Sequence, residues 1–195
     1  MENKSIIVTE ELYPFLSKDE VFATIKRWSQ KKNIVPNVNY ANDPLVVESL
    51  AHSFETKLRD GFFYIVRGSG DIICFSGMYY FEDRALGGHR TLVSPELAYT
   101  DYFFHTRYIT PKQIQRAIKD QRREYSVCFN EHNKRIYDHF KFRVESNRFP
   151  RGLEFLKYFE FAGKMMINHT EQWVMSLDLH KNRDLLLSLF ADNLL

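Results

Sequence analysis

The chain has 195 residues, of which 44% are hydrophobic and 27% are charged, a composition typical of a globular domain and not of a disordered segment. Its formal net charge is only +2, which does not favour a dedicated nucleic-acid-binding protein. Aromatic residues are numerous, with 17 Phe and 11 Tyr, and they favour a core of aromatic strands or a groove lined by rings.

The cysteines and the apolar segments indicate neither a metal site nor a membrane span. Cys74 and Cys128 each lie in an apolar, strand-like run, and no Cys/His cluster has metal-ligand spacing. We therefore expect reduced, packed thiols and no bound metal. No segment approaches 18 uninterrupted apolar residues, so we expect a soluble, cytoplasmic protein that does not enter a membrane.

Two amphipathic helices are predicted before the first sheet strands. The first covers residues 17–33, where Ser17 and Glu20 have the spacing of a capping box and apolar residues recur at helical spacing. The second covers residues 43–58, with Pro44 in the first turn after the cap residue Asp43.

The periodicity then changes to that of strands. Residues 61–83 contain two runs rich in aromatic and β-branched residues, joined by Gly68-Ser69-Gly70-Asp71, which predicts a β-hairpin. Residues 87–109 predict one long strand with a bulge or break at Pro95, because proline removes a ladder donor.

The second half alternates helices and strands. A helix is predicted over residues 110–125, with Thr110 as its cap and Pro111 as its first residue. A short strand over residues 126–130 and a helix that begins after Asn133 follow it. The remaining predicted elements are two strands within residues 155–179, which turn near Gly163 or near Asn168-His169, and an amphipathic helix over residues 181–195.

This order predicts an α+β fold with a mixed, mostly antiparallel central sheet flanked by helices. The helix over residues 110–125 acts as a crossover, so the strands on either side of it should be parallel. We expect residues 1–180 to form a single domain and residues 181–195 to pack on that domain or on a partner.

The order of elements resembles the GCN5-related N-acetyltransferase (GNAT) fold, over residues 15–178 by topology. Residues 104–112 and 126–142 carry the parts of the chain that are similar to the family's motifs. Asn133 matches an Asn near the start of a helix, and Ile136 matches the apolar residue three positions later. Phe140 stands where the family usually has Tyr, and no Gly precedes Phe142.

The resemblance implies an acyl-CoA-dependent N-acyltransferase, with acetyl-CoA or another acyl-CoA as co-substrate and an amine as acceptor. The family usually closes a glycine-rich turn around the pyrophosphate, whereas this chain has "HTRYITPKQ", without glycine and with Pro111 removing one donor. The residues that the resemblance assigns to the cofactor are Phe104, Arg107, Tyr108, Ile109, Thr110, Lys112 and Asn133.

The reaction also needs acid–base groups and an acceptor site. Glu96, beside the predicted strand break, is the candidate general base, with Glu131 as the alternative, and Tyr137 is the candidate proton donor to the thiolate. His169 and Glu171 would lie on one strand face and contact the acceptor amine; alternatively they are a hairpin turn and its first solvent-facing residue.

Two other classes of function remain open from the sequence. A GNAT-like fold that lost the glycine turn and the Tyr could serve as a non-catalytic binding or assembly protein. In that case the leucine-rich tail "DLLLSLF" is the expected site of homodimer formation. The segments "KDQRREY" and "KRIYDHFKFR" interleave basic and aromatic residues as a single-strand nucleic-acid groove does, but the low net charge disfavours that function.

Overall fold

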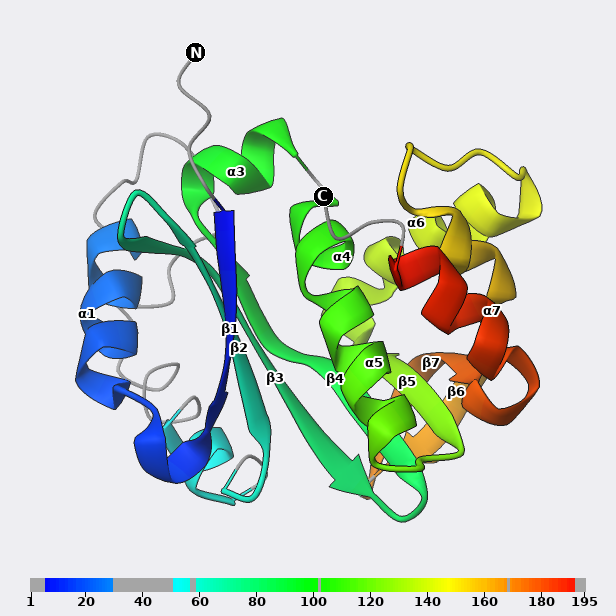
Figure 1. The fold of residues 1–195 in the computed structure, drawn as a ribbon, viewed down its shortest axis with the longest axis horizontal. Helices are drawn as coiled ribbons and strands as arrows, with labels where there is room; N and C mark the ends of the chain where they lie inside the picture. Colours follow the sequence, from blue (N-terminus) through cyan, green and yellow to red (C-terminus); the bar gives the residue numbers. More distant parts are fainter. Residues whose placement is uncertain (1–5, 30–50, 57–58, 102, 168, 192–195) are drawn as a thin grey trace. The chain divides into compact units, whose positions relative to one another are not determined.

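The computed structural model describes residues 6–29, 51–56, 59–101, 103–167 and 169–191 (Figure 1). The strands form one seven-stranded sheet in the order β1-β2-β3-β4-β5-β7-β6. They are β1 (Ile6–Leu12), β2 (Phe62–Gly68), β3 (Asp71–Phe81), β4 (Arg84–Val93), β5 (Glu124–Phe129), β6 (Glu160–Ile167) and β7 (Thr170–Asp178). The α-helices are α1 (Lys18–Ser29), α3 (Pro95–Thr100), α4 (Phe104–Tyr108), α5 (Thr110–Lys119), α6 (Lys134–Glu145) and α7 (Leu179–Ala191). Three 3₁₀ turns, η1 (Tyr13–Phe15), η2 (Glu131–Asn133) and η3 (Glu154–Tyr158), complete the described elements.

The sheet is mixed and mostly antiparallel, as the sequence predicts. β4 and β5, which flank the crossover through α5, pair in parallel, whereas β1–β2, β2–β3, β5–β7 and β6–β7 pair antiparallel. The hairpin predicted between β2 and β3 is confirmed, with Ser69 and Gly70 at positive φ in its turn. The chain divides into two compact units, residues 1–79 with 90–109 and residues 80–89 with 110–195.

In the first unit, α1 packs its apolar face on the sheet. Val21, Ile25 and Trp28 are buried together with Phe63 of β2. The ring of Phe54 meets that of Phe63 edge-on, with 5.3 Å between their centroids. The predicted amphipathic pattern of α1 is therefore the face that covers these strands.

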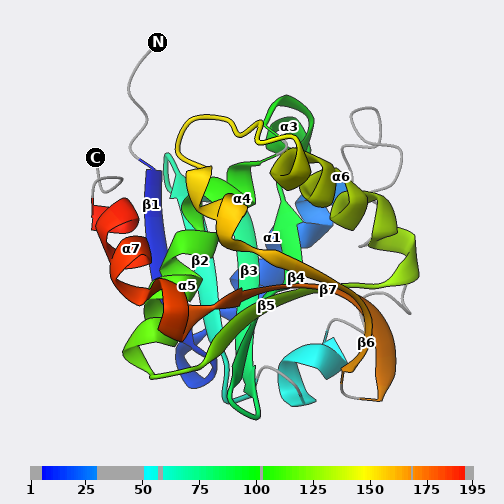
Figure 2. The same ribbon diagram turned by 90° about the vertical axis from the view of Figure 1, so that its right-hand side faces the viewer.

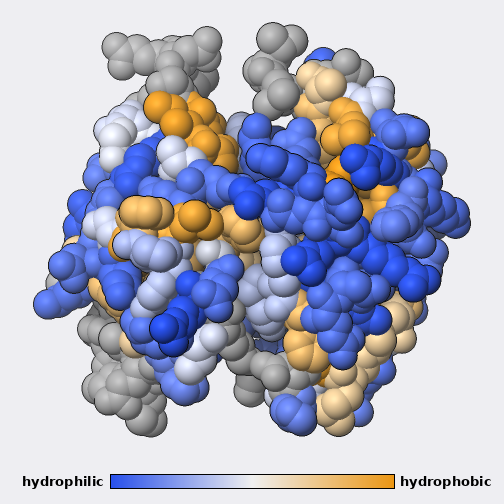
Figure 3. Space-filling view, turned by 60° about the horizontal axis from the view of Figure 1, so that its bottom comes forward, coloured by the Kyte–Doolittle hydropathy of each residue, from blue (hydrophilic) through white to orange (hydrophobic). Residues whose placement is uncertain are grey.

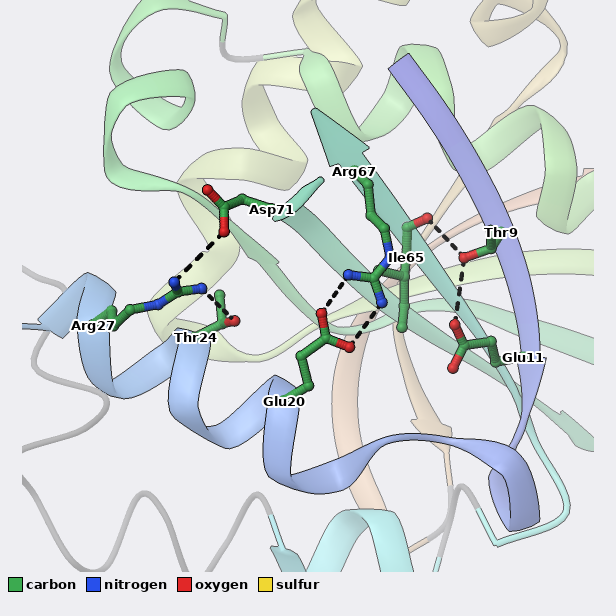
Figure 4. A network of polar contacts seen from close by, with 8 residues as sticks. All are labelled: Thr9, Glu11, Glu20, Thr24, Arg27, Ile65, Arg67 and Asp71. Carbon is green, nitrogen blue, oxygen red and sulfur yellow. Dashed lines mark hydrogen bonds and ion pairs between the residues drawn. The ribbon is translucent and has the colours of Figure 1, made fainter. Parts of the chain in front are cut away.

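Polar contacts fasten the outer side of α1 to the same hairpin (Figure 4). The Arg67 guanidinium donates to both carboxylate oxygens of Glu20, with 2.8 Å between Nη2 and Oε2. These hydrogen bonds hold the pKa of Glu20 below its ordinary value. Arg27 forms a longer ion pair with Asp71, with 3.5 Å between Nη1 and Oδ1. The Glu20–Arg67 pair thus links helix α1 to strand β2.

In the second unit, helices pack on the strands β5 and β7. α5 and α7 contact each other and β5, whereas α6 contacts β5 and β7 (Figure 2). α7 buries Leu179, Leu186 and Phe190, and the Phe190 ring lies edge-on to Phe155 with 5.4 Å between centroids. The tail helix begins two residues before the predicted start and docks on its own unit through its apolar face.

The prediction of one long strand over residues 87–109 is wrong. β4 ends at Val93, and the short helices α3 and α4 follow. The backbone N–H of Ser94 donates to the carbonyl of Ile73, at 2.8 Å, and Pro95 then starts α3. Proline suits the first turn of a helix, since its missing N–H has no intrahelical acceptor there. The signal read as a strand break is a helix start.

Two further predictions meet the structure differently. The strand β1 was not predicted, yet it pairs with β2 in register from Ile6↔Gly68 to Leu12↔Phe62. The helix predicted over residues 43–58 lies mostly outside the described residues, of which residues 51–56 are helical.

The molecular face in Figure 3 is mostly hydrophilic, and its apolar side chains form small separate patches. In the part of the chain that the structure describes, no helix is long and apolar enough to cross a membrane.

Candidate functional site

The second unit contains the point at which the two parallel strands separate. β4 pairs with β5 from Arg84↔Glu124 to Gly87↔Val127. Both strands continue beyond this ladder, β4 to Val93 and β5 to Phe129. The parallel ladder therefore ends within both strands, and the backbone groups that follow it do not pair with each other.

Gly87 lies at the end of that ladder, against the side chain of Tyr125. A β carbon added to Gly87 would lie 2.0 Å from the phenol oxygen and 2.3 Å from Cζ of Tyr125. No side chain larger than hydrogen fits there. Tyr125 is fully buried, and burial raises the pKa of its phenol far above the ordinary value. This phenol is therefore a neutral hydrogen-bonding group in the folded protein.

A buried glutamine joins the ladder's end to the start of α5. Oε1 of Gln113 accepts the Tyr125 hydroxyl at 2.7 Å and the backbone N–H of Gly88 at 3.2 Å. Thr110, the first residue of α5, also hydrogen-bonds the Tyr125 phenol, which moderates the rise of its pKa. The N–H of Gly88, the first residue beyond the ladder, thus faces a helix side chain. This network holds the first turn of α5 beside the separating strands.

The first turn of α5 carries the predicted phosphate-binding residues of this unit. Thr110 is buried, whereas Lys112 is partly exposed. The positive end of a helix and a lysine in its first turn both favour an anion. The structure places Pro111 inside this turn, where it supplies no backbone donor.

The junction between β5 and α6 is built by Asn130 and not by Asn133. Oδ1 of Asn130 accepts the backbone N–H of Asn133 at 3.0 Å, which closes the 3₁₀ turn η2. Asn133 is the exposed residue before α6, and its side chain makes no capping hydrogen bond. The sequence leaves residues 131–133 between the predicted strand and the predicted helix, and the structure folds them into this 3₁₀ turn.

Tyr137 is part of the aromatic core of this unit. It is 2% exposed, and its ring contacts those of Phe129, Phe161 and Trp173. Its hydroxyl oxygen accepts the backbone N–H of Gly163 at 3.1 Å. Gly163 has φ +78 and lies at a register shift between β6 and β7. Tyr137 thus supports the bulge as an acceptor, and the hydrogen of its hydroxyl is not part of this hydrogen bond.

A cluster of charged groups surrounds the indole of Trp173. Its Nε1 donates to Glu131 at 3.1 Å, and the Lys164 ammonium lies 3.4 Å from Glu131, 3.1 Å from Glu171 and 5.4 Å from the ring centroid. The indole and then Lys164 hold the pKa of Glu131 below its ordinary value. A carboxylate with a lowered pKa is a weaker base, so Glu131 is better suited to binding an ammonium than to removing a proton.

His169 and Glu171 do not share a strand face as the sequence predicted. His169 has φ +62 and is an exposed residue of the turn between β6 and β7. Glu171 is the second residue of β7, close to that turn. Of these two residues, only Glu171 contacts Lys164 in the cluster around Trp173. The alternative expectation, a hairpin turn followed by solvent-facing residues, describes this segment.

The other predicted site residues belong to the first unit. Glu96 is an exposed residue in the first turn of α3, so the expectation of a base on a strand beside a bulge is wrong. On α4, the rings of Phe104 and Tyr108 contact each other at a tilt of 44°, with 4.7 Å between their centroids, and Arg107 forms an ion pair with Asp101. Ile109 is fully buried after α4.

Cys128 is a free, partly buried cysteine near the end of β5. Burial raises the pKa of its thiol to about 11, so the thiol stays protonated at neutral pH. Since the thiolate is the reactive form, this protonated thiol is a poor nucleophile.

Gln113 and the Gly87–Tyr125 contact are the site features that sequence reasoning missed. Gly87 and Gly88 were read only as a strand start. A Gly pair within a run of strand-forming residues often marks a close approach of another group, and that signal was present. Nothing in the local sequence pointed to Tyr125 as the group that approaches.

No family model and no curated protein matches the sequence. Solved structures match its fold at low identity. A Desulfovibrio desulfuricans protein classed as an acetyltransferase of the GNAT family has a TM-score of 0.51 and 10% identity, over 90% of this chain and 99% of that chain. The IAA acetyltransferase of Bacillus cereus has a TM-score of 0.52 and 7% identity, over 90% and 100%. A chimera of the Vibrio cholerae spermidine N-acetyltransferase has a TM-score of 0.53 and 10% identity, over 91% and 98%. The chain therefore has the GNAT fold, as its order of elements indicated.

Proposed function

We propose that the protein is an acyl-CoA-dependent N-acyltransferase that transfers an acetyl or another acyl group to an amine. The observation that carries this proposal is the end of the parallel β4–β5 ladder at Gly87 and Val127, in a fold shared with acetyltransferases. Beyond that point the two strands no longer pair with each other, so an extended ligand would lie between them.

The acyl-CoA would bind where β4 and β5 separate, with its pyrophosphate at the first turn of α5. Lys112 would neutralise phosphate charge there, and Thr110 lies at the same helix end. Asn133, which precedes α6 in the same unit, also belongs to the proposed cofactor set. Because the turn lacks glycine, side chains would replace some of the backbone donors that the fold usually offers.

The reaction would be a direct attack of the amine on the thioester. The amine nitrogen forms a bond to the carbonyl carbon, the carbon–sulfur bond breaks, and the proton released by the amine ends on the CoA sulfur. Tyr137 is the proposed proton donor to the sulfur, since its hydroxyl accepts from Gly163 and retains its proton.

The cluster around Trp173 suggests how an acceptor amine would be held. Glu131 and Glu171 already bind the ammonium of Lys164 in front of an indole ring. A cationic acceptor would use the same carboxylates and the same ring face.

One observation supports a non-catalytic alternative. Tyr137, the candidate acid, is a 2%-exposed core residue with three aromatic neighbours. A protein that retained the fold as a binding or assembly module would keep such a tyrosine for packing alone. It would bind no acyl-CoA.

Acyl-CoA binding separates these two functions. A ligand that binds only the folded state raises its stability by roughly 2.7 kcal/mol at a hundredfold excess over Kd. We expect acetyl-CoA to raise the melting temperature of the parent protein saturably, and Lys112→Ala to weaken this effect. Lys119→Ala, at the other end of α5, is the matched control and should respond as the parent does. The absence of any shift with acetyl-CoA or CoA at millimolar concentration would favour the non-catalytic alternative.

A further inference from the structure

A small pocket with basic walls lies in the second unit, between the end of α5 and the start of α7. Its volume is about 180 Å³. The residues that line it are Ile118, Gln121, Arg122, Leu179, His180 and Arg183. Pockets for drug-sized ligands usually measure about 300–1,000 Å³, so this one suits a small ion or the end group of a larger molecule.

The pocket combines an apolar floor with cationic walls. Ile118 is 4% exposed and Leu179 is 2% exposed, so these two side chains form the apolar floor of the pocket. Arg122 and Arg183 supply two guanidinium groups, which present forked N–H donors that fit carboxylate and phosphate oxygens. Charge interactions are stronger beside such an apolar base than in open water.

The position of Arg122 is fixed. Its guanidinium carbon lies 3.9 Å from the ring centroid of Tyr80, and Nη1 donates to the carbonyl of Glu82 at 3.3 Å. Its Nε is buried and has no hydrogen-bond acceptor among the described residues. A buried donor without an acceptor is costly, so this side chain is held in place at some cost in stability.

The two arginines of the pocket are not paired with acidic side chains in the described part of the chain. Neither guanidinium forms an ion pair with a described carboxylate. The carboxylate of Asp120, two residues before Arg122, accepts hydrogen bonds from Arg116 and from the Tyr80 hydroxyl. Asp178 caps α7 by accepting the N–H of Lys181 at 2.8 Å.

We propose that this pocket binds a small oxyanion, a phosphate or a carboxylate group, through Arg122 and Arg183. Gln121 and His180 add side-chain donors at the wall of the pocket. The pocket shares no residue with the proposed acyl-CoA site, so this inference stands independently of the proposed function.

Titration with inorganic phosphate and with acetate, at constant ionic strength set by chloride, tests the proposal. Isothermal calorimetry should show saturable binding of at least one of the two anions to the full chain; the anion that binds more tightly identifies the source of the oxyanion. Arg183→Gln should raise its Kd by about tenfold or more, as expected for the loss of a charge-assisted hydrogen bond. Arg183 is exposed, so the variant should fold like the parent.

Two control variants make the test decisive. Lys181→Gln removes one exposed positive charge from the same turn of α7 outside the pocket, and it should bind as the parent does. Lys112→Gln removes a charge from the proposed cofactor site and should also leave this binding unchanged. Unchanged binding in Arg183→Gln, equal weakening in Lys181→Gln, loss of binding in Lys112→Gln, or no saturable binding of either anion to the parent would each overturn the proposal.

Discussion

The phenol of Tyr125 occupies the space in which a side chain at position 87 would stand, and only glycine is compatible with that contact. The same phenol hydrogen-bonds Gln113, whose amide oxygen also accepts the N–H of Gly88. One buried side chain of β5 therefore determines the residue type at the end of the parallel ladder. It also positions the first turn of α5 at the point where the strands separate.

Replacing Gly87 with alanine should destabilise the protein by roughly 3 kcal/mol or more, because the new methyl group would overlap a buried ring. Gly68→Ala is the matched control. A β carbon at Gly68 would meet only the flexible end of Ile73, at 3.1 Å, and should cost about 1 kcal/mol or less. Urea unfolding of both variants measures the difference; equal costs would show that the Tyr125 ring yields readily.

Gln113→Leu removes the acceptor that Tyr125 and the Gly88 amide share. The Tyr125 hydroxyl and the Gly88 N–H would then lack their shared acceptor, and the free energy of unfolding should fall by about 1–3 kcal/mol. Hydrogen exchange gives the more specific readout, since the Gly88 amide should exchange faster while amides of β1 keep their protection. A protected Gly88 amide in the variant would mean that Gln113 does not hold it.

His105 makes the stability of the first unit depend on pH. Its Nε2 lies 3.1 Å from Ser76 Oγ and 3.4 Å from Thr91 Oγ1, and burial lowers the pKa of the imidazole to about 4. The folded state therefore resists a proton that the unfolded chain accepts near pH 6.5. The stabilisation is complete above about pH 6.5 and is lost as the pH falls toward 4, by at most about 3 kcal/mol. The loss of unfolding free energy should be smaller than about 3 kcal/mol, because His105 keeps some solvent exposure.

Urea unfolding between pH 7 and pH 4 checks this dependence. His105→Gln cannot be protonated, so its free energy of unfolding should fall less steeply than that of the parent over this interval. Parallel curves for the two proteins would assign the acid sensitivity to other groups.

Arg67→Met tests the polar tether between α1 and β2. Both side chains of the Arg67–Glu20 pair are partly exposed, so its removal should cost about 1 kcal/mol or less. High salt should reduce the difference between variant and parent, as expected for a screened ion pair. Arg27→Met, which removes a more exposed pair with Asp71, should cost less still. A loss of several kcal/mol in Arg67→Met would indicate that the aliphatic stem of Arg67 also packs in the core.

The order of elements and the mixed sheet were predictable because their signals are local. Apolar periodicity marked α1, the Gly68–Asp71 turn marked the β2–β3 hairpin, and Thr110-Pro111 marked the start of α5. The segment after β4 was not predictable in this way. Its aromatic residues favour a strand by intrinsic preference, and tertiary packing makes α4 instead, with Phe104 buried. β1 was missed because its residues alternate only weakly between buried and exposed positions.

The site was less predictable than the fold, because its defining contacts join residues distant in sequence. Gly87 and Tyr125 are neighbours only because β4 and β5 pair in parallel across a helix. Asn133 was selected for its place in a motif, whereas Asn130 makes the hydrogen bond at that turn. Pro95 suggests a strand break in the sequence but starts helix α3 in the structure, so Glu96 lies on that helix and not on a strand.

Amide NMR of the protein titrated with acetyl-CoA tests the central claim most directly. If acyl-CoA binds where β4 and β5 separate, the amides of Gly88 and Cys128 should shift saturably, and the amides of the β2–β3 turn should not. The same two amides should shift less in Lys112→Ala at equal ligand concentration. Saturable shifts confined to other parts of the chain, or no shifts at millimolar acetyl-CoA, would contradict an acyltransferase site at the end of this ladder.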